Sequence, residues 1–248
     1  MAVDNPDGGG RFVLVCDHAS NWVPTSLKGL GLPDSELERH IAWDPGALEL
    51  ARRLSDLLDA PLVHATVSRL VLDVNRDPSH PGSIVTRSED TEVPGDREIS
   101  SAERTRRVQS IYEPYHRALD AVIEKREEPQ IISVHSFTPI YRQEQRPWHI
   151  GILHGDDTRI SQPLLELLRA DGEFCVGDNQ PYAPTDGVYH TLDRHCSSRN
   201  LRSVLLELRS DTLSTEDGRE QWALRLQRAL MAMPPAQPVM PPTQSGIH

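Results

Sequence analysis

Three apolar segments, far apart in the chain, each end in a side chain able to bind a metal or move a proton. Residues 12–18 (Phe-Val-Leu-Val-Cys-Asp-His) end in a histidine, and residues 131–135 (Ile-Ile-Ser-Val-His) end in another. Residues 204–209 (Val-Leu-Leu-Glu-Leu-Arg) carry a glutamate and then an arginine. Such aliphatic runs are typical of the buried strands of a parallel sheet. Open α/β sheets place their chemistry beyond the carboxyl ends of these strands, so we expect the three polar side chains to meet there.

The remaining pattern alternates strands with helices. The periodicity predicts helices over 34–40, 45–58, 100–125, 164–170 and 220–231. It predicts further strands over 61–64, 70–74, 149–154 and 173–176. Residues 77–99 are polar and turn-rich, which is typical of a long functional loop. Asp44 followed by Pro45 has the pattern of a helix cap before the first helical position.

Alternating units of this kind predict a single α/β domain over residues 11–232, with a mixed but mostly parallel sheet flanked by helices. Residues 1–10 are Gly-rich and residues 233–248 are rich in Pro and Gln. We therefore expect both ends to be disordered tails.

The composition argues against several classes of function. A formal net charge of −11 argues against a nucleic-acid partner, because binding a polyanion draws on clustered Lys and Arg. No apolar stretch approaches the ~20 residues of a membrane span. The first ten residues lack the basic region and apolar core of a signal peptide, and the three cysteines have no metal-like spacing. We expect a cytoplasmic protein that acts on a small molecule.

The two histidines, His18 and His135, both follow apolar strands. Imidazole is a common zinc ligand, usually oriented by a hydrogen-bond acceptor on its second nitrogen, and Asp17 or Ser20 could orient His18. A single buried histidine is more often structural than a ligand. Two in matched positions at strand ends favour a shared metal.

Glu207 lies inside an apolar strand, where an unpaired charge is costly. Arg209 is two residues away and so on the same face, which allows a purely structural Glu–Arg pair. The functional interpretation makes Glu207 a general base that takes a proton from metal-bound water, with its pKa raised by burial.

Asn75 and Arg76 end another predicted strand. A guanidinium there suits two-point binding of a substrate carboxylate, and Arg69 and Arg209 are further candidates for the same role. The alternative is an arginine that anchors a loop. The residues support an anionic N-acyl amino acid as the substrate.

Five segments together resemble the N-formylglutamate amidohydrolase family: residues 16–24, 42–47, 68–76, 133–139 and 206–211, within a match from about residue 12 to 230. That family is similar to the zinc carboxypeptidases and aspartoacylases. The resemblance implies a phosphorylase/hydrolase-like fold of the zinc-dependent exopeptidase type, and hydrolysis of N-formyl-L-glutamate to formate and glutamate. It also implies that Asn75 and Arg76 hold the substrate carboxylate and that Glu207 is catalytic.

One position departs from the carboxypeptidase pattern. Those enzymes bind zinc through His-x-x-Glu and a later histidine, whereas Asn21 stands three residues after His18. Asp44 could supply the missing carboxylate, giving His18, Asp44 and His135 as the metal ligands. The alternatives are Asp44 as a helix cap and Asn21 as the ligand.

Two other classes of function remain open at the level of sequence. A binding or regulatory protein could keep this fold without metal, as the asparagine at position 21 suggests. A serine or cysteine hydrolase could use Cys16 or Ser20 beside His18, although the chain has no Gly-x-Ser-x-Gly elbow.

Overall fold

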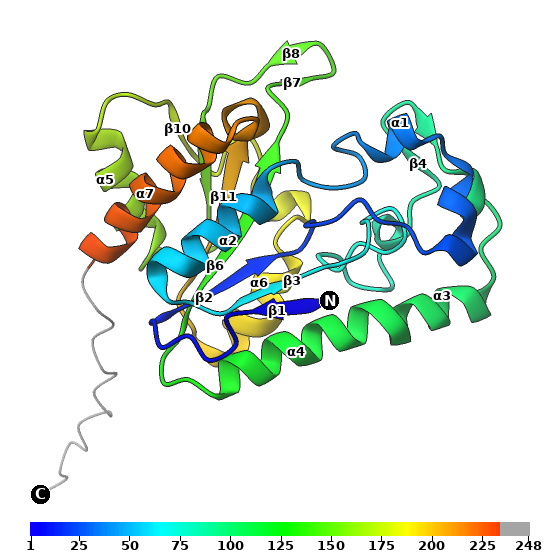
Figure 1. Ribbon diagram of the computed structural model, residues 1–248, viewed down its shortest axis with the longest axis horizontal. Coiled ribbons are helices and arrows are strands. Elements are labelled where there is room, and N and C mark those ends of the chain that lie inside the picture. The colour runs from blue at the N-terminus through cyan, green and yellow to red at the C-terminus, as the bar shows by residue number, and fades with distance from the viewer. Residues whose placement is uncertain (234–248) are drawn as a thin grey trace, which may run out of the picture.

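A computed structural model describes residues 1–233 of the chain. Within them, seven strands form one sheet in the order β1-β3-β2-β6-β11-β9-β10 (Figure 1). These strands are β1 (Ala2–Asp4), β2 (Phe12–Cys16), β3 (Leu62–His64), β6 (Gln130–Phe137), β9 (Ile150–Leu153), β10 (Val176–Asp178) and β11 (Ser203–Arg209). The central pairs β3–β2, β2–β6 and β6–β11 are parallel, while β1 and β9 run antiparallel to β3 and β11. The predicted single α/β domain with a mixed, mostly parallel sheet is confirmed.

Helices cover both faces of the sheet. They are α1 (Asp34–Leu37), α2 (Ala47–Leu58), α3 (Ser101–Arg107), α4 (Glu113–Glu124), α5 (Ser161–Ala170), α6 (His190–Cys196) and α7 (Glu216–Ala232). Two short hairpins, β4 (Arg87–Ser88) with β5 (Thr91–Glu92) and β7 (Ile140–Tyr141) with β8 (Glu144–Gln145), project from the loops.

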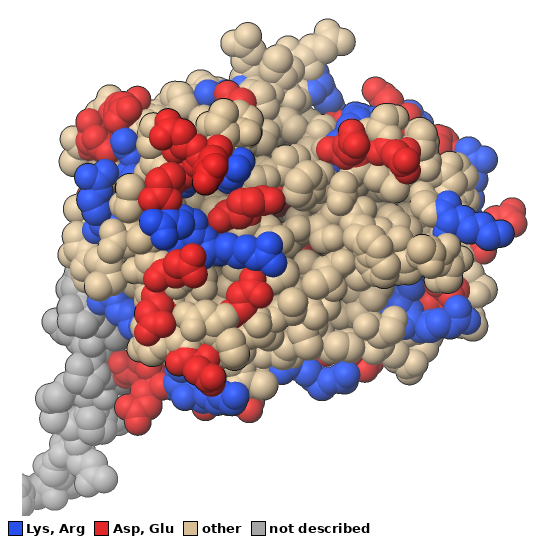
Figure 2. Space-filling model, in the orientation of Figure 1, with Lys and Arg blue, Asp and Glu red and all other residues tan. Residues whose placement is uncertain are grey.

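Alternation along the strands explains the two-sided core. Leu14 and Ile132 face one layer, where they join a cluster with α2, α5 and α7. Val15 and Ile131 face the other layer and pack with α4 and α6. Because successive strand residues point to opposite faces, an all-apolar strand must be covered on both sides. The outer faces of α2 and α7 carry charges of both signs, with Arg53 and Glu220 paired at 2.5 Å (Figure 2).

Residues 70–74 were expected to form a strand, and the structure corrects this to a buried turn. The Ser68 carbonyl accepts the backbone N–H of Val71, and the Ser68 hydroxyl accepts that of Leu70. Leu70 and Val71 are buried in a third apolar cluster. An apolar run reports burial, and a buried loop gives the same signal as a buried strand.

The expectation of a disordered segment over residues 1–10 is also corrected. Residues 2–4 form β1, and the backbone of Gly9 and Gly10 bonds to Asp59 at 2.9 and 2.8 Å. A Cβ on Gly10 would lie 2.1 Å from the Leu58 carbonyl oxygen, so glycine here permits close backbone approach. Of the expected C-terminal tail, Met233 is buried at the end of α7, and residues 234–248 lie outside the described part of the chain.

Other boundaries differ by a few residues. The long helix predicted over 100–125 is present, capped by Ser100, but a π-helical turn (Val108–Tyr112) separates α3 from α4 just before Pro114. The strand expected over 173–176 lies at 176–178. Within the described residues, no helix is both long and apolar enough to cross a membrane.

Candidate active site

The carboxyl ends of β2, β6 and β11 bring His18, His135 and Glu207 together. Glu207 and His135 are register partners on the parallel strands β11 and β6. His18 follows β2, and its ring centroid lies 4.9 Å from that of His135. All three side chains are buried, at 4%, 2% and 5% exposure. The three side chains therefore lie together at one edge of the sheet, as expected from the three apolar segments.

Asp44 joins this group because the chain turns before α2. Its backbone N–H donates to the His18 carbonyl at 2.9 Å, and Gly46 adopts a left-handed φ of 80°. The helix therefore begins at Ala47, and the Asp44 side chain does not cap it. Its Oδ2 instead lies 2.9 Å from His135 Nδ1 and 3.4 Å from His18 Nδ1. The prediction that Asp44 caps this helix is therefore wrong.

His18, Asp44 and His135 each offer one donor atom, and these atoms lie within 4.8 Å of one another. The other ring nitrogens face carboxylates: His18 Nε2 is 2.7 Å from Asp73, and His135 Nε2 is 3.0 Å from Asp17. Carboxylates in these positions orient metal-binding imidazoles in many proteins. The buried Nδ1 of His18 has no hydrogen-bond partner. Two imidazoles and a carboxylate, with one nitrogen left unpaired, form a group that could hold a divalent metal such as zinc.

The two supporting carboxylates are themselves held in place. Asp17 Oδ1 accepts the hydroxyls of Tyr115 at 2.7 Å and Thr191 at 2.8 Å. Burial opposes its ionisation, but hydrogen bonding and charge from His135 lower the pKa of Asp17 to about 2. Contacts with Tyr115, Thr191 and His135 thus fix the side chain of Asp17.

Asp73 lies in the buried turn after β3 and accepts from the Asn75 backbone N–H and from Arg69 Nη2, both at 2.9 Å. Burial opposes ionisation here as well, yet His18 and Arg69 hold the pKa of Asp73 well below its ordinary value. Asp73 is not among the site residues predicted from the sequence. The signal that singled out Glu207, an acidic residue within an apolar run, also occurs at Asp73.

Glu207 has a distinct environment. Its Oε2 is buried without a hydrogen-bond partner. Burial raises the pKa of Glu207 from 4.5 to about 7, with His135 opposing the shift and Asp44 adding to it. Arg209 does not pair with it, since its Nε binds Asp211 at 2.8 Å and its Nη1 binds the Arg146 carbonyl at 3.3 Å. A structural ion pair between Glu207 and Arg209 is therefore absent from the described residues. Arg209 is also not among the residues that line the pocket.

A pocket of about 380 Å³ opens above this group, and Arg69, Asn75 and Arg76 line it. Both ends of the Asn75 amide are engaged by backbone: Nδ2 donates to Val188 at 2.6 Å and Oδ1 accepts from Thr191 at 2.8 Å. The Asn75 side chain thus links its own turn to the backbone of Val188 and Thr191 and holds one wall of the pocket in place.

Arg76 donates Nη1 to the carbonyls of Gly187 and Asp186, and its Nε lies 3.9 Å from Asp73 Oδ2. Arg69 Nη1 lies 3.7 Å from Asp44 Oδ1. Both guanidinium groups therefore stand between the pocket and the carboxylates that surround His18.

The other candidates lie elsewhere. Asn21 lines a separate surface pocket beside Trp22, and the Ser20 hydroxyl accepts the Trp22 backbone N–H at 3.1 Å. Cys16 is fully buried, and burial together with Asp44 and Asp17 raises the pKa of its thiol well above the ordinary value. A thiol in that state is a poor nucleophile.

The family model for N-formylglutamate amidohydrolase matches residues 10–214. The solved structure of gene product Atu2144 from Agrobacterium tumefaciens is 37% identical, covers 93% of this chain and 92% of that one, and has a TM-score of 0.91. The N-formylglutamate amidohydrolase from Ralstonia eutropha JMP134 is 18% identical, with coverages of 93% and 95% and a TM-score of 0.66, a likeness of fold. No match was found among curated proteins. The sequence resemblance is confirmed, and the chain belongs to the N-formylglutamate amidohydrolase family.

Proposed function

We propose that this protein is a metal-dependent amidohydrolase that cleaves the amide bond of an N-acyl amino acid, with N-formyl amino acids such as N-formyl-L-glutamate as the leading candidates. The observation that carries the proposal is the position of Glu207, buried and unpaired, beside the His18–Asp44–His135 group at the base of the pocket. Family membership supports the amide hydrolysis.

His18, Asp44 and His135 would hold the metal, and zinc suits these donor types. A bound zinc ion would polarise the scissile carbonyl and lower the pKa of water beside it. Asp73 and Asp17 support this assignment, because each contacts the outer nitrogen of one histidine and so turns the inner nitrogen toward the shared group.

Glu207 would act on protons. In its ionised form it accepts a proton from the attacking water, and it then delivers that proton to the leaving amine nitrogen. A pKa of about 7 suits both steps, since the group can gain and lose a proton near neutral pH. The low exposure of Glu207, 5%, limits exchange of that proton with bulk water.

Arg69 and Arg76 would bind the α-carboxylate of the substrate. Both line the pocket, and their positions at Asp73 bring them close to the His18 side of the metal group. An arginine fork fixes a carboxylate at two points and so orients the scissile amide.

The experiment is a substrate screen on zinc-loaded protein with N-formyl, N-acetyl and N-succinyl amino acids, measured as release of free amine. We expect about one metal ion per chain, N-formyl substrates to be cleaved, and chelation to abolish the activity. Protein that binds no metal and cleaves none of them would support the metal-free binding relative. Activity that survives complete metal removal would revive the serine or cysteine hydrolase, against which the buried Cys16 thiol counts.

A further inference from the structure

Tyr182 and Arg146 form a hydrogen-bonded pair at one wall of the pocket. Tyr182 lines the pocket together with Glu207, and Arg146 directly follows β8 of the hairpin that projects beyond β6 (Figure 1). The Tyr182 hydroxyl oxygen lies 2.9 Å from Arg146 Nη1. A guanidinium group can only donate hydrogen bonds, so the tyrosine oxygen is the acceptor of this bond. The proton of the Tyr182 hydroxyl must therefore point elsewhere, and it has no acceptor within residues 1–233.

Aromatic rings hold the Arg146 guanidinium in place. Its Cζ lies 4.6 Å from the ring centroid of Tyr141, 4.8 Å from that of Tyr182 and 5.7 Å from that of Phe137. These three rings line the pocket, and no carboxylate of the described residues pairs with the guanidinium. Because its charge is not neutralised by a neighbouring carboxylate, the guanidinium polarises the Tyr182 hydroxyl and makes it a stronger hydrogen-bond donor.

The segment that carries Tyr182 packs against the strand position beside Glu207. Gly151 of β9 is the register partner of Glu207, and a Cβ on Gly151 would lie 1.9 Å from the Gln180 carbonyl oxygen. The chain thus passes directly over this edge of the sheet two residues before Tyr182. Burial raises the pKa of Tyr182, the charge of Glu207 adds to the rise, and Arg146 opposes it. The hydroxyl therefore keeps its proton near neutral pH.

The other two hydroxyl groups that line the pocket at the end of β6 are already engaged. Ser136 Oγ donates to the Pro45 carbonyl at 2.9 Å, and Thr138 Oγ1 donates to the Ile140 carbonyl at 2.7 Å. Both protons are thus taken up by backbone. The Tyr182 hydroxyl differs from them, because its proton remains available to a molecule in the pocket.

We propose that Tyr182 is a further catalytic residue of this site, whose hydroxyl donates a hydrogen bond to the oxygen of the scissile amide, and that Arg146 positions this hydroxyl. The inference rests on the proposed amidohydrolase function. When water attacks the amide carbon, the C=O double bond becomes a single bond and its electron pair moves onto the oxygen. A donor already aimed at that oxygen binds it more tightly as the charge develops, which lowers the barrier. Tyr182 keeps its own proton throughout, because Glu207 carries the proton of the water to the leaving amine.

The test compares Tyr182→Phe with Tyr141→Phe in the zinc-loaded full chain, using the N-formyl amino acid that the unaltered protein cleaves best. Each substitution removes one hydroxyl and keeps the ring against Arg146, so both variants should fold and bind metal normally. We expect Tyr182→Phe to lower kcat about 10²-fold with little change in KM, because the lost bond strengthens in the transition state. Tyr141→Phe should keep its kcat, since the Tyr141 hydroxyl has no hydrogen bond with Arg146 in the described structure.

A normal kcat in the Tyr182→Phe variant, or a raised KM with kcat unchanged, would overturn the inference and leave the amidohydrolase intact. An equal fall in kcat in the Tyr141→Phe variant would also overturn it, because the effect would not depend on the hydroxyl that Arg146 holds. An unaltered protein that cleaves no N-formyl amino acid would overturn both the inference and the proposed function.

A double-mutant cycle tests the positioning role of Arg146. Arg146→Met removes the donor to Tyr182 and should lower kcat about tenfold in the unaltered protein. Added to the Tyr182→Phe protein, the same substitution should lower kcat no further, because the hydroxyl that it positions is already gone. Arg142→Met is the matched control, since Arg142 is exposed and lies over the outer ring, that of Tyr141, at 5.3 Å. Equal losses from Arg146→Met in both proteins would show that Arg146 is only structural and would contradict its positioning role.

Discussion

Glu207 and His135 are partners in the register of β11 and β6, so a proton-transfer group and a metal-ligand candidate stand side by side on adjacent parallel strands. On its other side, Glu207 is partnered with Gly151 of β9. A Cβ on Gly151 would lie 1.9 Å from the Gln180 carbonyl oxygen and 3.4 Å from Glu207 Cβ. The sheet thus offers Glu207 a polar neighbour on one strand and only backbone on the next, which leaves one of its oxygens unpaired.

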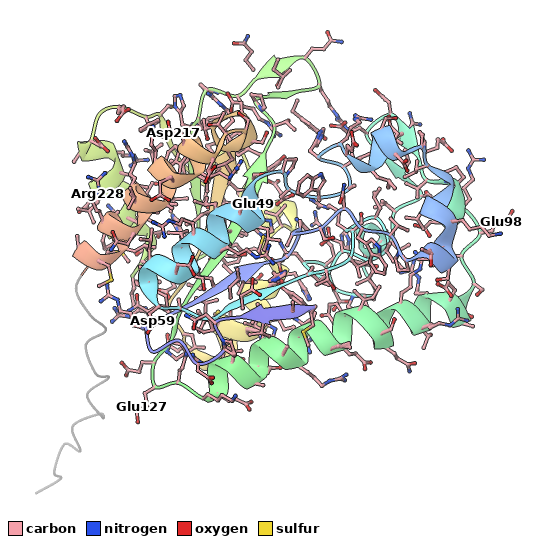
Figure 3. The ribbon with its side chains drawn as sticks, in the orientation of Figure 1. Glu49, Asp59, Glu98, Glu127, Asp217 and Arg228 are labelled. Atoms are coloured by element: carbon pink, nitrogen blue, oxygen red, sulfur yellow. The ribbon has the colours of Figure 1, made fainter. Side chains whose placement is uncertain are left out.

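Glu207→Gln should lower kcat by about 10²–10⁴-fold while the protein still binds its metal, because the amide cannot accept the proton. Turnover of an N-formyl amino acid and metal content by elemental analysis check this together. Glu49→Gln is the control, since Glu49 is exposed on α2 (Figure 3). Near-normal turnover in the Glu207 variant would make this glutamate structural.

The same substitution should stabilise the metal-free protein at high pH. Burial raises the pKa of Glu207 to about 7 from 4.5, so the folded state keeps a proton that the unfolded chain has lost. Stability therefore falls as pH rises from about 4.5 to 7, and the loss is complete above 7. Glu207→Gln removes this loss, worth at most on the order of 3 kcal/mol at pH 8 and little at pH 5. Urea unfolding with chelator at both pH values measures it, and a gain that is independent of pH would contradict the explanation.

Asp73→Asn should weaken metal binding about 10–100-fold, because the amide supports the His18 ring less well than a carboxylate does. Competition with a chelator of known affinity gives the change. Asp217→Asn, at an exposed position on α7, should have no effect (Figure 3). If the Asp73→Asn variant binds metal as tightly as the unaltered protein, then metal binding does not depend on the contact between Asp73 and His18.

Arg76→Ala should raise KM strongly, with a smaller fall in kcat, for an overall loss of about ten- to hundred-fold in kcat/KM. Arg76→Lys should restore little, because an ammonium group lacks the planar fork. Exposed Arg228 on α7 provides an alanine control (Figure 3). An unchanged KM in a folded Arg76→Ala protein would indicate that Arg69, the other arginine of the pocket lining, binds the carboxylate instead.

Much of the site could be predicted from local sequence. A histidine or glutamate inside an aliphatic run is a local signal, and parallel strands align their carboxyl ends at one edge of the sheet. His18, His135 and Glu207 could therefore be assigned to one place without coordinates. The buried turn at residues 70–74 has the same apolar pattern as a strand, since apolar composition reports burial and not backbone shape.

Tertiary structure decided how the groups are paired. The sequence left Asp44 as either a helix cap or a metal ligand, and only the turn at Gly46 directs its carboxylate toward His135. Asp73 reaches His18 across 55 residues, and Asp17 supports His135 and not the adjacent His18. Such pairings join residues distant in the chain, and they depend on how the loops pack above the sheet. Local propensity and periodicity carry no information about that packing, because both describe only neighbours along the chain.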